Sequence, residues 1–378
     1  MINAYLRADG RKGIRNTLVV AYLVECAHHV SREIYYPFRE QGAHLIGFPG
    51  CFPNVYSHQM MERLCTHPNV GGALLVSLGC EGFNKGKLQE TIRRSGRPVK
   101  LLEIQGTGGT RKTIAEGKAW IEQTLKQLEN TPRANMELDE LIVGTICGGS
   151  DATSGLTANP AMGRAFDFLV EKNATCIFEE TGELIGMEHW MAKRAENPAL
   201  GEEIIKTVAK AAKYYATYGH ASIGPGNADG GLTTIEEKSL GATHKAGERT
   251  TLEAVVGYAA PITAKGLTVM DTPGLDVESV TGMVGGGAQI VIFTTGLGTP
   301  TGNPIAPVVK ITGNSRTAVT MADNTDLDVS GVISETESLD AAADRLMAEL
   351  LTVCSGKDTA AERLGHREFA IHRRNSTI

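Results

Sequence analysis

The sequence predicts an α/β fold in which mostly parallel sheets are flanked by helices as Rossmann-like units, arranged in two packed domains. Short apolar runs alternate with longer amphipathic segments through the first half of the 378 residues. Strands that are apolar on both faces are typical of parallel sheets covered by helices on both sides. The chain is also longer than a usual single domain. We place a boundary near residue 220, which gives domains of residues 1–220 and 221–378.

The expected elements follow from the hydrophobic pattern. Strands are expected at residues 17–24, 43–48, 72–78, 99–104, 141–146 and 175–178, with helices at about 26–41, 54–66, 86–95, 111–129 and 160–172. A helical section over 188–218 precedes a Gly/Pro/Asn-rich loop at 224–231 and a helix at 233–240. Strands at 267–270, 289–293 and 308–311 and a helix at 339–354 complete the list. Residues 130–137 suit either a linker or a surface loop.

Composition argues against several classes of protein. The formal net charge is −6 and aromatic residues make up 5%, so neither a basic surface nor a base-stacking platform is expected, and we predict no nucleic-acid partner. No apolar run reaches the length of about 18 residues that a membrane span needs. The N-terminus lacks the apolar core of a signal peptide. Seven cysteines without such a signal predict reduced thiols in the cytoplasm.

Four of the cysteines directly follow predicted strands: Cys26, Cys51, Cys80 and Cys147. In open α/β sheets ligands bind beyond the carboxyl ends of the strands, so parallel strands would bring these thiols to one edge. One interpretation is a metal site with soft ligands, which suits ferrous iron, zinc or an iron–sulfur cluster. The other is four small buried hydrophobic residues, because free cysteine is among the most buried residue types. The remaining three cysteines lie inside predicted elements and are expected in the core.

Other polar segments allow two interpretations each. The loop at 106–110 precedes a helix and could hold an anion, but neither a P-loop nor a dinucleotide fingerprint is present, which disfavours a nucleotide-dependent oxidoreductase. The segment 294–298 at a strand end offers the hydroxyl of Thr295 to a ligand, or is an ordinary turn. Arg11 and Arg15 suit a carboxylate group, or else pin a structural hairpin through Arg–Asp pairs.

Several strings resemble the dehydratases that act on altronate and galactarate. They are CGGSDATSGLTANP at 147–160, GGLTTIEEKSLG at 230–241, MDTPG at 270–274, HPNVGG at 67–72 with LGCE at 78–81, and the basic segment 7–16. The resemblance runs from about residue 5 to the C-terminus, and long glycine-containing strings in the same order make it specific. The sequence is therefore identified as a member of the altronate/galactarate dehydratase family.

The sequence also departs from that family's pattern. Members often carry a small N-terminal domain of the SAF type, whereas this sequence begins at the large domain, so a separate small subunit is expected. The segment before Cys51 lacks the usual histidine, Ile146 replaces a glutamate, and 220–224 replaces an Asn-rich stretch. These positions suit a change of substrate. The large subunit of sulfolactate sulfo-lyase resembles the chain in the same way, and it is the competing identity.

The resemblance implies an iron-dependent lyase acting on a 2-hydroxy acid. A base removes the proton at C2, a divalent metal stabilises the enediolate, and the group on C3 leaves as water or sulfite. Fe²⁺ or an iron–sulfur cluster is expected, with Mn²⁺ as an alternative. The proposed ligands are Cys51, Cys80 and Cys147, with Cys26 as a fourth.

The roles of the remaining site residues are expected as follows. Lys238 is the favoured base, which requires burial to remove its charge; a salt-bridged surface lysine is the alternative. Asp151 would orient a ligand or the base, and histidines at 220 and 244 would donate protons. The substrate would contact Ser150, Asn159, Asn227 and Thr295 through hydroxyls, and Arg11 and Arg15 through its acid group. We expect a homo-oligomer; a subunit that is inactive without its small partner is the alternative from another class.

Overall fold

The computed structural model describes residues 2–217, 219 and 223–372, and it divides into two compact units. Unit 1 comprises the described residues up to Met136, with Pro304–Ala306 and the last two described residues; unit 2 comprises Glu137–Asn303 and Pro307–Ala370. The division therefore falls at 136/137, inside the polar segment 130–137, and not near 220. The reason is that strands from before 220 join the same sheet as the later ones.

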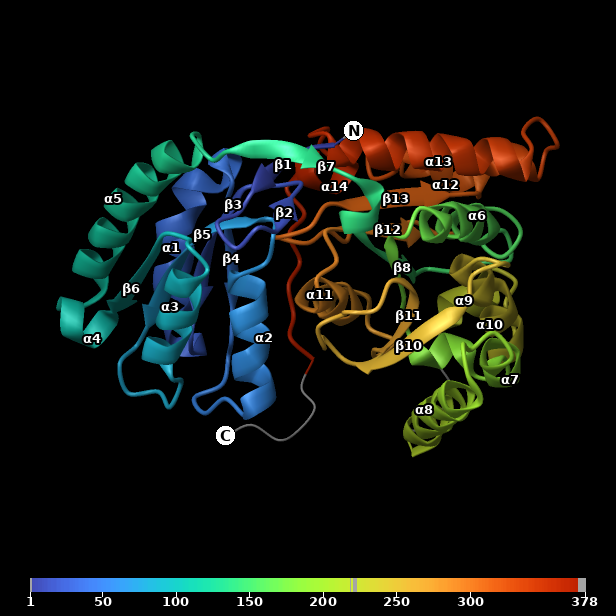
Figure 1. The fold of residues 1–378 in the computed structure, drawn as a ribbon, viewed down its shortest axis with the longest axis horizontal. Coiled ribbons are helices and arrows are strands. Elements are labelled where there is room, and N and C mark those ends of the chain that lie inside the picture. Colours follow the sequence, from blue (N-terminus) through green and yellow to red (C-terminus); the bar gives the residue numbers. More distant parts are fainter. Residues whose placement is uncertain (1, 218, 220–222, 373–378) are drawn as a thin grey trace. The chain divides into compact units, whose positions relative to one another are not determined.

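Unit 1 is built on a four-stranded parallel sheet of order β4-β3-β5-β6. Its strands are β3 (Thr17–Tyr22), β4 (Ala43–Gly47), β5 (Val70–Ser77) and β6 (Val99–Glu103). Its helices are η1 (Glu25–Ala27), α1 (His28–Tyr35), η2 (Tyr36–Gln41), α2 (Val55–Cys65), α3 (Lys85–Arg94), α4 (Ile104–Thr107) and α5 (Thr110–Leu128). Helix α1 packs against α5, and α2 against α3 (Figure 1). Gly117 permits the first contact, because a Cβ there would lie 2.7 Å from the Ile34 side chain.

A small antiparallel sheet of order β2-β1-β7 also belongs to unit 1. Its strands are β1 (Ile2–Leu6), β2 (Lys12–Gly13) and β7 (Arg133–Met136). The buried guanidinium of Arg7 follows β1 and donates to the carbonyls of Pro68 and Arg15 and to the side chain of Asn16. These strands were not predicted from the sequence, because each strand is short and pairs either with a strand that is distant in the chain or with one of only two residues.

Unit 2 contains a seven-stranded, fully parallel sheet of order β10-β11-β9-β8-β12-β13-β14. Its strands are β8 (Ile142–Cys147), β9 (Thr175–Phe178), β10 (Leu252–Gly257), β11 (Gly266–Asp271), β12 (Ile290–Thr294), β13 (Val308–Thr312) and β14 (Leu327–Asp328). Strand order reverses between β8 and β12, which is where ligands bind in sheets of this kind. The predicted α/β class with parallel sheets flanked by helices is confirmed.

The helices of unit 2 surround this sheet. They are η3 (Leu138–Glu140), α6 (Ala158–Glu171), η4 (Thr181–Leu184), α7 (Glu188–Ala192), α8 (Pro198–Thr217), α9 (Pro225–Asp229), α10 (Ile235–Thr243), η5 (His244–Ala246), α11 (Asp276–Gly286), α12 (Ser315–Thr320), η6 (Ser330–Val332), α13 (Leu339–Cys354) and α14 (Ala360–Leu364). Helix α11 was not predicted, because its glycines disfavour a helix. Gly282 is required there, since a Cβ would lie 2.4 Å from the Tyr258 ring.

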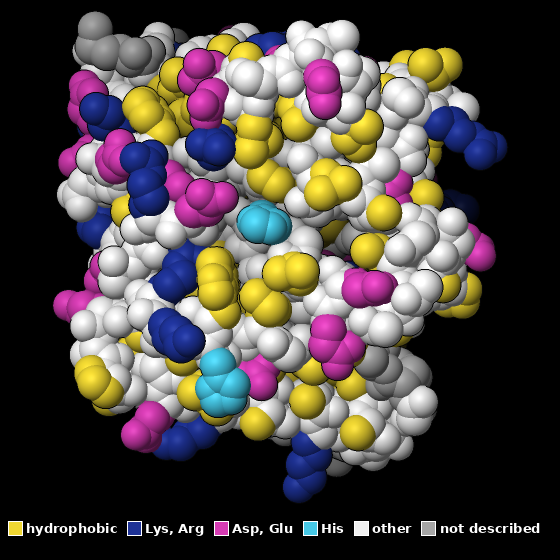
Figure 2. Space-filling view, turned by 90° about the vertical axis from the view of Figure 1, so that its right-hand side faces the viewer, with side chains coloured by type: hydrophobic (Ala, Val, Ile, Leu, Met, Phe, Trp, Pro, Cys, Tyr) yellow, Lys and Arg dark blue, Asp and Glu magenta, His cyan; other side chains and the backbone are white. Residues whose placement is uncertain are grey.

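The surface of one face mixes hydrophobic and charged side chains. Figure 2 looks onto the right-hand side of Figure 1, and on that face hydrophobic side chains reach the surface between basic and acidic ones. In the described part of the chain, none of the helices combines the length and the apolar character that crossing a membrane requires.

Candidate active site

The carboxyl edge of the unit 2 sheet collects the polar segments that follow its strands. Strand β8 ends at Cys147 and runs into Gly148–Asp151, and β9 ends at Phe178 and runs into Glu179–Glu183. Because β8 and β9 are adjacent and parallel, both segments emerge on the same side. Helix α10 packs against η4 and brings a lysine to this edge.

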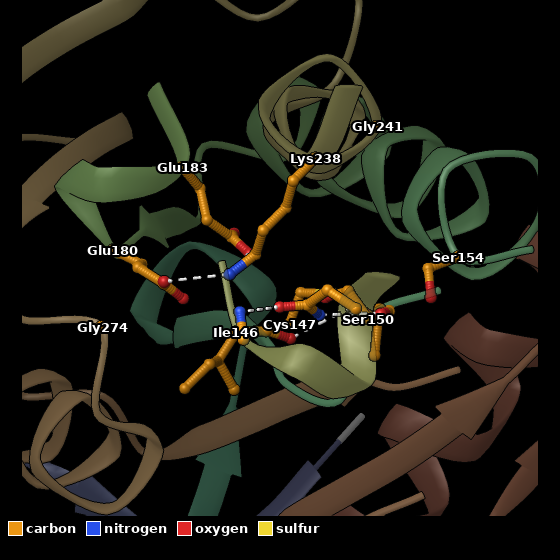
Figure 3. A network of polar contacts seen from close by, with 12 residues as sticks. Ile146, Cys147, Ser150, Ser154, Glu180, Glu183, Lys238, Gly241 and Gly274 are labelled. Atoms are coloured by element: carbon orange, nitrogen blue, oxygen red, sulfur yellow. Dashed lines mark hydrogen bonds and ion pairs between the residues drawn. The ribbon is translucent and has the colours of Figure 1, made fainter. Parts of the chain in front are cut away.

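Five charged side chains form what we call the buried charge cluster: Glu179, Glu180, Glu183, Lys238 and Lys245. Glu183 joins the two lysines, with Oε2 2.5 Å from Nζ of Lys245 and Oε1 3.7 Å from Nζ of Lys238. Lys238 also lies 3.4 Å from Oε1 of Glu180, and Lys245 3.9 Å from Oε1 of Glu179. Figure 3 shows Lys238 reaching down from its helix toward Glu180 and Glu183.

The cluster fixes the protonation states of its members. Burial lowers the pKa of Lys238, but the carboxylates of Glu180 and Glu183 outweigh it, so the pKa lies above its ordinary value. Lys245 behaves in the same way, chiefly through Glu183. Burial raises the pKa of Glu179 well above its usual range. Each lysine lies beside a glutamate, which permits ionised groups inside the protein.

The backbone at Glu180 is strained, and a neighbouring strand holds it in place. Glu180 has φ 60° and ψ 79°, a left-handed conformation that costs free energy in a residue with a side chain. Its N–H donates to Oγ1 of Thr272 at 2.6 Å, and the same hydroxyl donates to Oε2 of Glu179 at 3.2 Å. Thr272 belongs to the MDTPG string after β11, so that string positions the acidic segment after β9.

A cavity of about 280 Å³ lies beside the cluster. Its wall includes Ser150, Asp151, Ser154, Asn159, Glu237, Lys238 and His244, with Leu156, Leu232 and Leu240. Lys238 is the one member of the buried charge cluster in this wall. Helix α10 comes close to the turn that follows the CGGSD segment because Gly155 meets Gly241; a Cβ on Gly155 would lie 2.9 Å from the Cα of Gly241. The cavity therefore brings carboxylate, imidazole and ammonium groups into one wall.

Asp151 lies in the cavity wall, but both oxygens of its carboxylate accept hydrogen bonds from neighbouring residues of the protein. Its Oδ1 accepts from the hydroxyls of Thr153 and Ser154 and from the N–H of Ser154, and its Oδ2 accepts from Nδ2 of Asn314 at 2.7 Å. The carboxylate thus folds the turn after β8 and ties it to the loop after β13. These bonds orient the turn itself, and the predicted role of Asp151 in orienting a metal ligand or the base stays a prediction.

The residues predicted to bind substrate hydroxyls also hold the framework. Nδ2 of Asn227 donates to the carbonyl of Ser150 at 2.8 Å, and Nδ2 of Asn159 donates to the carbonyl of Gly241 at 3.0 Å. Oγ1 of Thr295 accepts the N–H of Gly298 at 2.9 Å within a turn. Ser150 and Asn159 line the cavity, whereas Asn227 and Thr295 are absent from its wall.

Of the predicted proton-transfer residues, Lys238 is at the site, and His220 lies outside the described residues. The burial that was expected to neutralise Lys238 is present, but its two carboxylate partners keep it charged. The other members of the charge cluster were not predicted from the sequence. A signal for three of them exists, because Glu179, Glu180 and Glu183 lie within five residues of the end of the predicted strand 175–178.

Unit 1 carries the other predicted cysteines at the carboxyl edge of its own sheet. Cys26 lies in η1 after β3, and Cys51 and Cys80 follow β4 and β5; all three are exposed. The N–H of Gly82 donates to the carbonyl of Cys51 at 2.8 Å, so the loops bearing Cys51 and Cys80 are in contact. The turn before Cys80 is fixed by Glu81, which accepts the N–H of Gly79 at 2.8 Å.

The predicted arginines lie at the opposite edge of that sheet. Arg11 and Arg15 precede β3, at its amino end. Arg11 pairs with Asp9 at 2.7 Å and donates to the carbonyl of Thr66, and Asp9 also pairs with the buried Arg97 at 2.9 Å. These contacts correspond to the hairpin pinned by Arg–Asp pairs, and within unit 1 they do not bring the arginines to the cysteine edge.

The predicted iron ligands fit a soft metal only in part. The exposed thiols of Cys51 and Cys80 suit one, because thiolates are soft ligands and the loops touch. Cys147 fits poorly: burial raises its pKa, and its sulfur shares a hydrogen bond of 2.6 Å with Oγ of Ser150. Among the described residues, the one set of three ligand atoms within 4.8 Å of each other belongs to Glu179, Glu180 and Glu183, which the two lysines already neutralise. The iron site stays a prediction.

Comparison with known proteins agrees with the resemblance noted in the sequence. The family described as D-galactarate/altronate dehydratase, C-terminal, matches residues 138–377, and D-galactarate dehydratase/altronate hydrolase, second domain, matches residues 4–129. The chain is 34% identical to the (2R)-sulfolactate sulfo-lyase subunit beta of Chromohalobacter salexigens over 98% of this chain and 96% of that one. It is 29% identical to the altronate dehydratase of Escherichia coli over 100% and 78%. It is 31% identical to the galactarate dehydratase of the same organism over 82% and 62%.

The fold, the charged cavity and these relatives define an enzyme of the lyase class. The chain belongs to the D-galactarate/altronate dehydratase family.

Proposed function

We propose that this lyase removes water from a sugar acid, a 2-hydroxy acid of the altronate or galactarate type, to give a 2-keto-3-deoxy acid. The observation that carries the proposal is the ammonium group of Lys238 in the wall of a cavity at the carboxyl edge of the sheet. The proton at C2 is only weakly acidic, so its removal requires a positive charge where the enediolate forms. A buried ammonium group stabilises that charge more strongly than one in water.

Other residues of the cavity wall have the remaining roles in the proposed reaction. His244 shares the wall with Lys238 and is the side chain we assign as the base, because histidine is the side chain that most often serves as a general base in enzymes. Asp151 keeps the turn that carries Ser150 in place, and Asn159 ties α6 to α10 across the cavity wall. The substrate carboxylate would lie near Lys238, and the C2 hydrogen would face His244.

We also propose iron dependence, with Cys51, Cys80 and Cys26 of unit 1 as the thiols that would hold Fe²⁺ or a cluster. When bound, the metal would supply Lewis-acid chemistry. Metal and acid-labile sulfide analysis of anaerobically purified protein tests this. About one iron per chain without sulfide, or about four of each, supports a lone ion or a cluster, respectively; no transition metal after reconstitution contradicts the proposal.

The reaction itself is tested with a panel of substrates. Altronate, galactarate and (2R)-sulfolactate are incubated separately with the iron-reconstituted protein, and both 2-keto acid and sulfite are measured. Keto acid from a sugar acid, with an H244A variant at least 100-fold slower, is the expected result. Keto acid formation from none of the sugar acids contradicts the proposed dehydration.

The second candidate is sulfite elimination from sulfolactate. The observation that favours it is the alignment with the sulfo-lyase subunit, which extends over nearly the whole of both chains at 34% identity. That relative is a subunit, so we further propose a small partner chain for this protein. Sulfite release that appears only after the partner is added would establish both points, and full activity of the isolated chain would contradict an obligatory partner. Gel filtration of the isolated chain, with and without that partner, tests the proposed homo-oligomer.

The proposed location is the cytoplasm. All seven cysteines are free in the structure, including three exposed thiols. Exposed thiols persist in a reducing compartment, which supports this assignment.

A further inference from the structure

We propose that Lys238 is the general acid of the elimination, giving an Nζ proton to the oxygen that leaves C3. This assignment rests on the proposed dehydration and deepens it. It also reverses the role predicted from the sequence, in which the same side chain removes the C2 proton.

Lys238 lies between the rest of the buried charge cluster and the cavity. Its Nζ lies 3.4 Å from Glu180 and 3.7 Å from Glu183, and its side chain lines the cavity. The other four members of the buried charge cluster are at most 3% exposed and are absent from the cavity wall. Lys238 is thus the route by which the cluster can exchange a proton with a bound ligand.

The surroundings keep Lys238 charged before the reaction. The carboxylates of Glu180 and Glu183 favour the ammonium form, and burial alone would favour the neutral amine. Lys245 holds Glu183 from the other side at 2.5 Å, so the orientation of Glu183 is fixed by a second cation. A side chain that is already protonated, fixed and in contact with the cavity is prepared to donate, and it has no vacant lone pair with which to accept.

The chemical step balances with the groups that the site supplies. After the base has taken the C2 proton, the electron pair at C2 forms the C2–C3 double bond as the C3–O bond breaks. The departing oxygen takes its electron pair and one proton from Nζ, and leaves as water. The enol product gains a proton at C3 and loses its hydroxyl proton to become the 2-keto acid. The base passes the C2 proton back through the solvent, and Lys238 becomes an ammonium group again.

An acid is needed here because hydroxide is a strongly basic leaving group; the pKa of bulk water is about 15.7. Fluoride is a far weaker base, so its departure needs little proton transfer. A substrate analogue in which fluorine replaces the C3 hydroxyl loses HF to give the same enol and the same product. The two leaving groups therefore separate proton donation from a purely electrostatic role of the same cation.

The experiment compares wild type and K238M on the sugar acid that the wild type accepts and on its 3-fluoro analogue. We expect K238M to lose about 10²- to 10⁴-fold more on the hydroxyl substrate than on the fluoro analogue, because removal of the charge affects both substrates and removal of the general acid affects only the first. The ratio of the two rates in one preparation does not depend on the fraction of folded protein. The double variant K238M/E180Q, which removes one charge of each sign, repeats the measurement with the charge of the cluster unchanged.

The control variant is K206M, which removes an exposed lysine of α8 that pairs with Glu202. It should leave both rates unchanged. Equal losses on both substrates in K238M would show that Lys238 acts by charge alone, and would overturn the assignment. A wild-type protein that acts on neither substrate would overturn the proposed dehydration, and the assignment with it.

Discussion

The carboxyl edges of the two parallel sheets have opposite chemistry, although the same strand–loop pattern forms both. In unit 1 the edge carries three exposed cysteines and polar groups open to solvent, such as Glu103 at 39% exposure. In unit 2 the edge carries a buried thiol, five buried ionisable side chains and a cavity. A parallel sheet positions whatever follows its strands; burial then decides whether those groups act as exposed ligands or as a paired charge cluster.

The largest expected effect concerns the exposed edge of unit 1. The double variant C51S/C80S should lose bound iron and at least about 100-fold in activity, because serine is a hard and poor ligand for ferrous iron. The thermal midpoint should barely change, since both side chains are exposed. Iron content and turnover are measured on the same anaerobic sample. Full iron and full turnover would remove the thiols from the proposed site.

The contrast between the edges predicts unequal costs for removing a lysine. K245M should lower the free energy of unfolding by about 3–5 kcal/mol, because it leaves Glu183 charged and buried without its closest cation. K85M in unit 1 removes the partner of the partly exposed Glu103 and should cost about 1 kcal/mol or less.

Denaturant unfolding of both variants measures this difference. K245M/E183Q, which removes both charges, should recover part of the loss. Equal costs at the two edges would show that the cluster is less well buried than the structure indicates.

A third lysine, Lys310, tests how burial acts on the pKa of an ammonium group that, among the described residues, has no carboxylate within hydrogen-bonding distance. Lys310 in β13 is 1% exposed, and within the described part of the chain its Nζ has no hydrogen-bond partner. Burial lowers its pKa from 10.5 to about 8, against a smaller opposing effect of Asp326. Between those pH values the unfolded chain binds more protons at this group than the folded one, so its contribution to stability rises with pH.

K310M should therefore be more stable than wild type at pH 7, by on the order of 2 kcal/mol, with a difference that shrinks between pH 8 and 10.5. Unfolding free energies of both proteins across this range measure it. A difference that does not vary with pH would mean that Lys310 titrates normally.

The smallest effects are expected at the amino edge of unit 1. R11A should cost less than about 1 kcal/mol, because its ion pair with Asp9 is exposed, and KM should not change. R15A should likewise leave KM unchanged, since Arg15 lies at the same edge. A KM that rises tenfold or more in either variant would restore the arginines as substrate ligands.

The sequence determined which segments form buried parallel strands, and so which residues stand at strand ends. Apolar runs on both faces leave few alternatives, and this sufficed to place Cys51, Cys80 and Cys147 after strands. Lys238 was singled out by the family resemblance of the string at 230–241. Only the tertiary structure decided where the domains divide, because the adjacency of β8 and β12 depends on residues about 145 positions apart. It also decided the charge of Lys238: one sequence shows a lysine among glutamates, but whether burial or two carboxylates dominate its pKa depends on distances that local pattern does not contain.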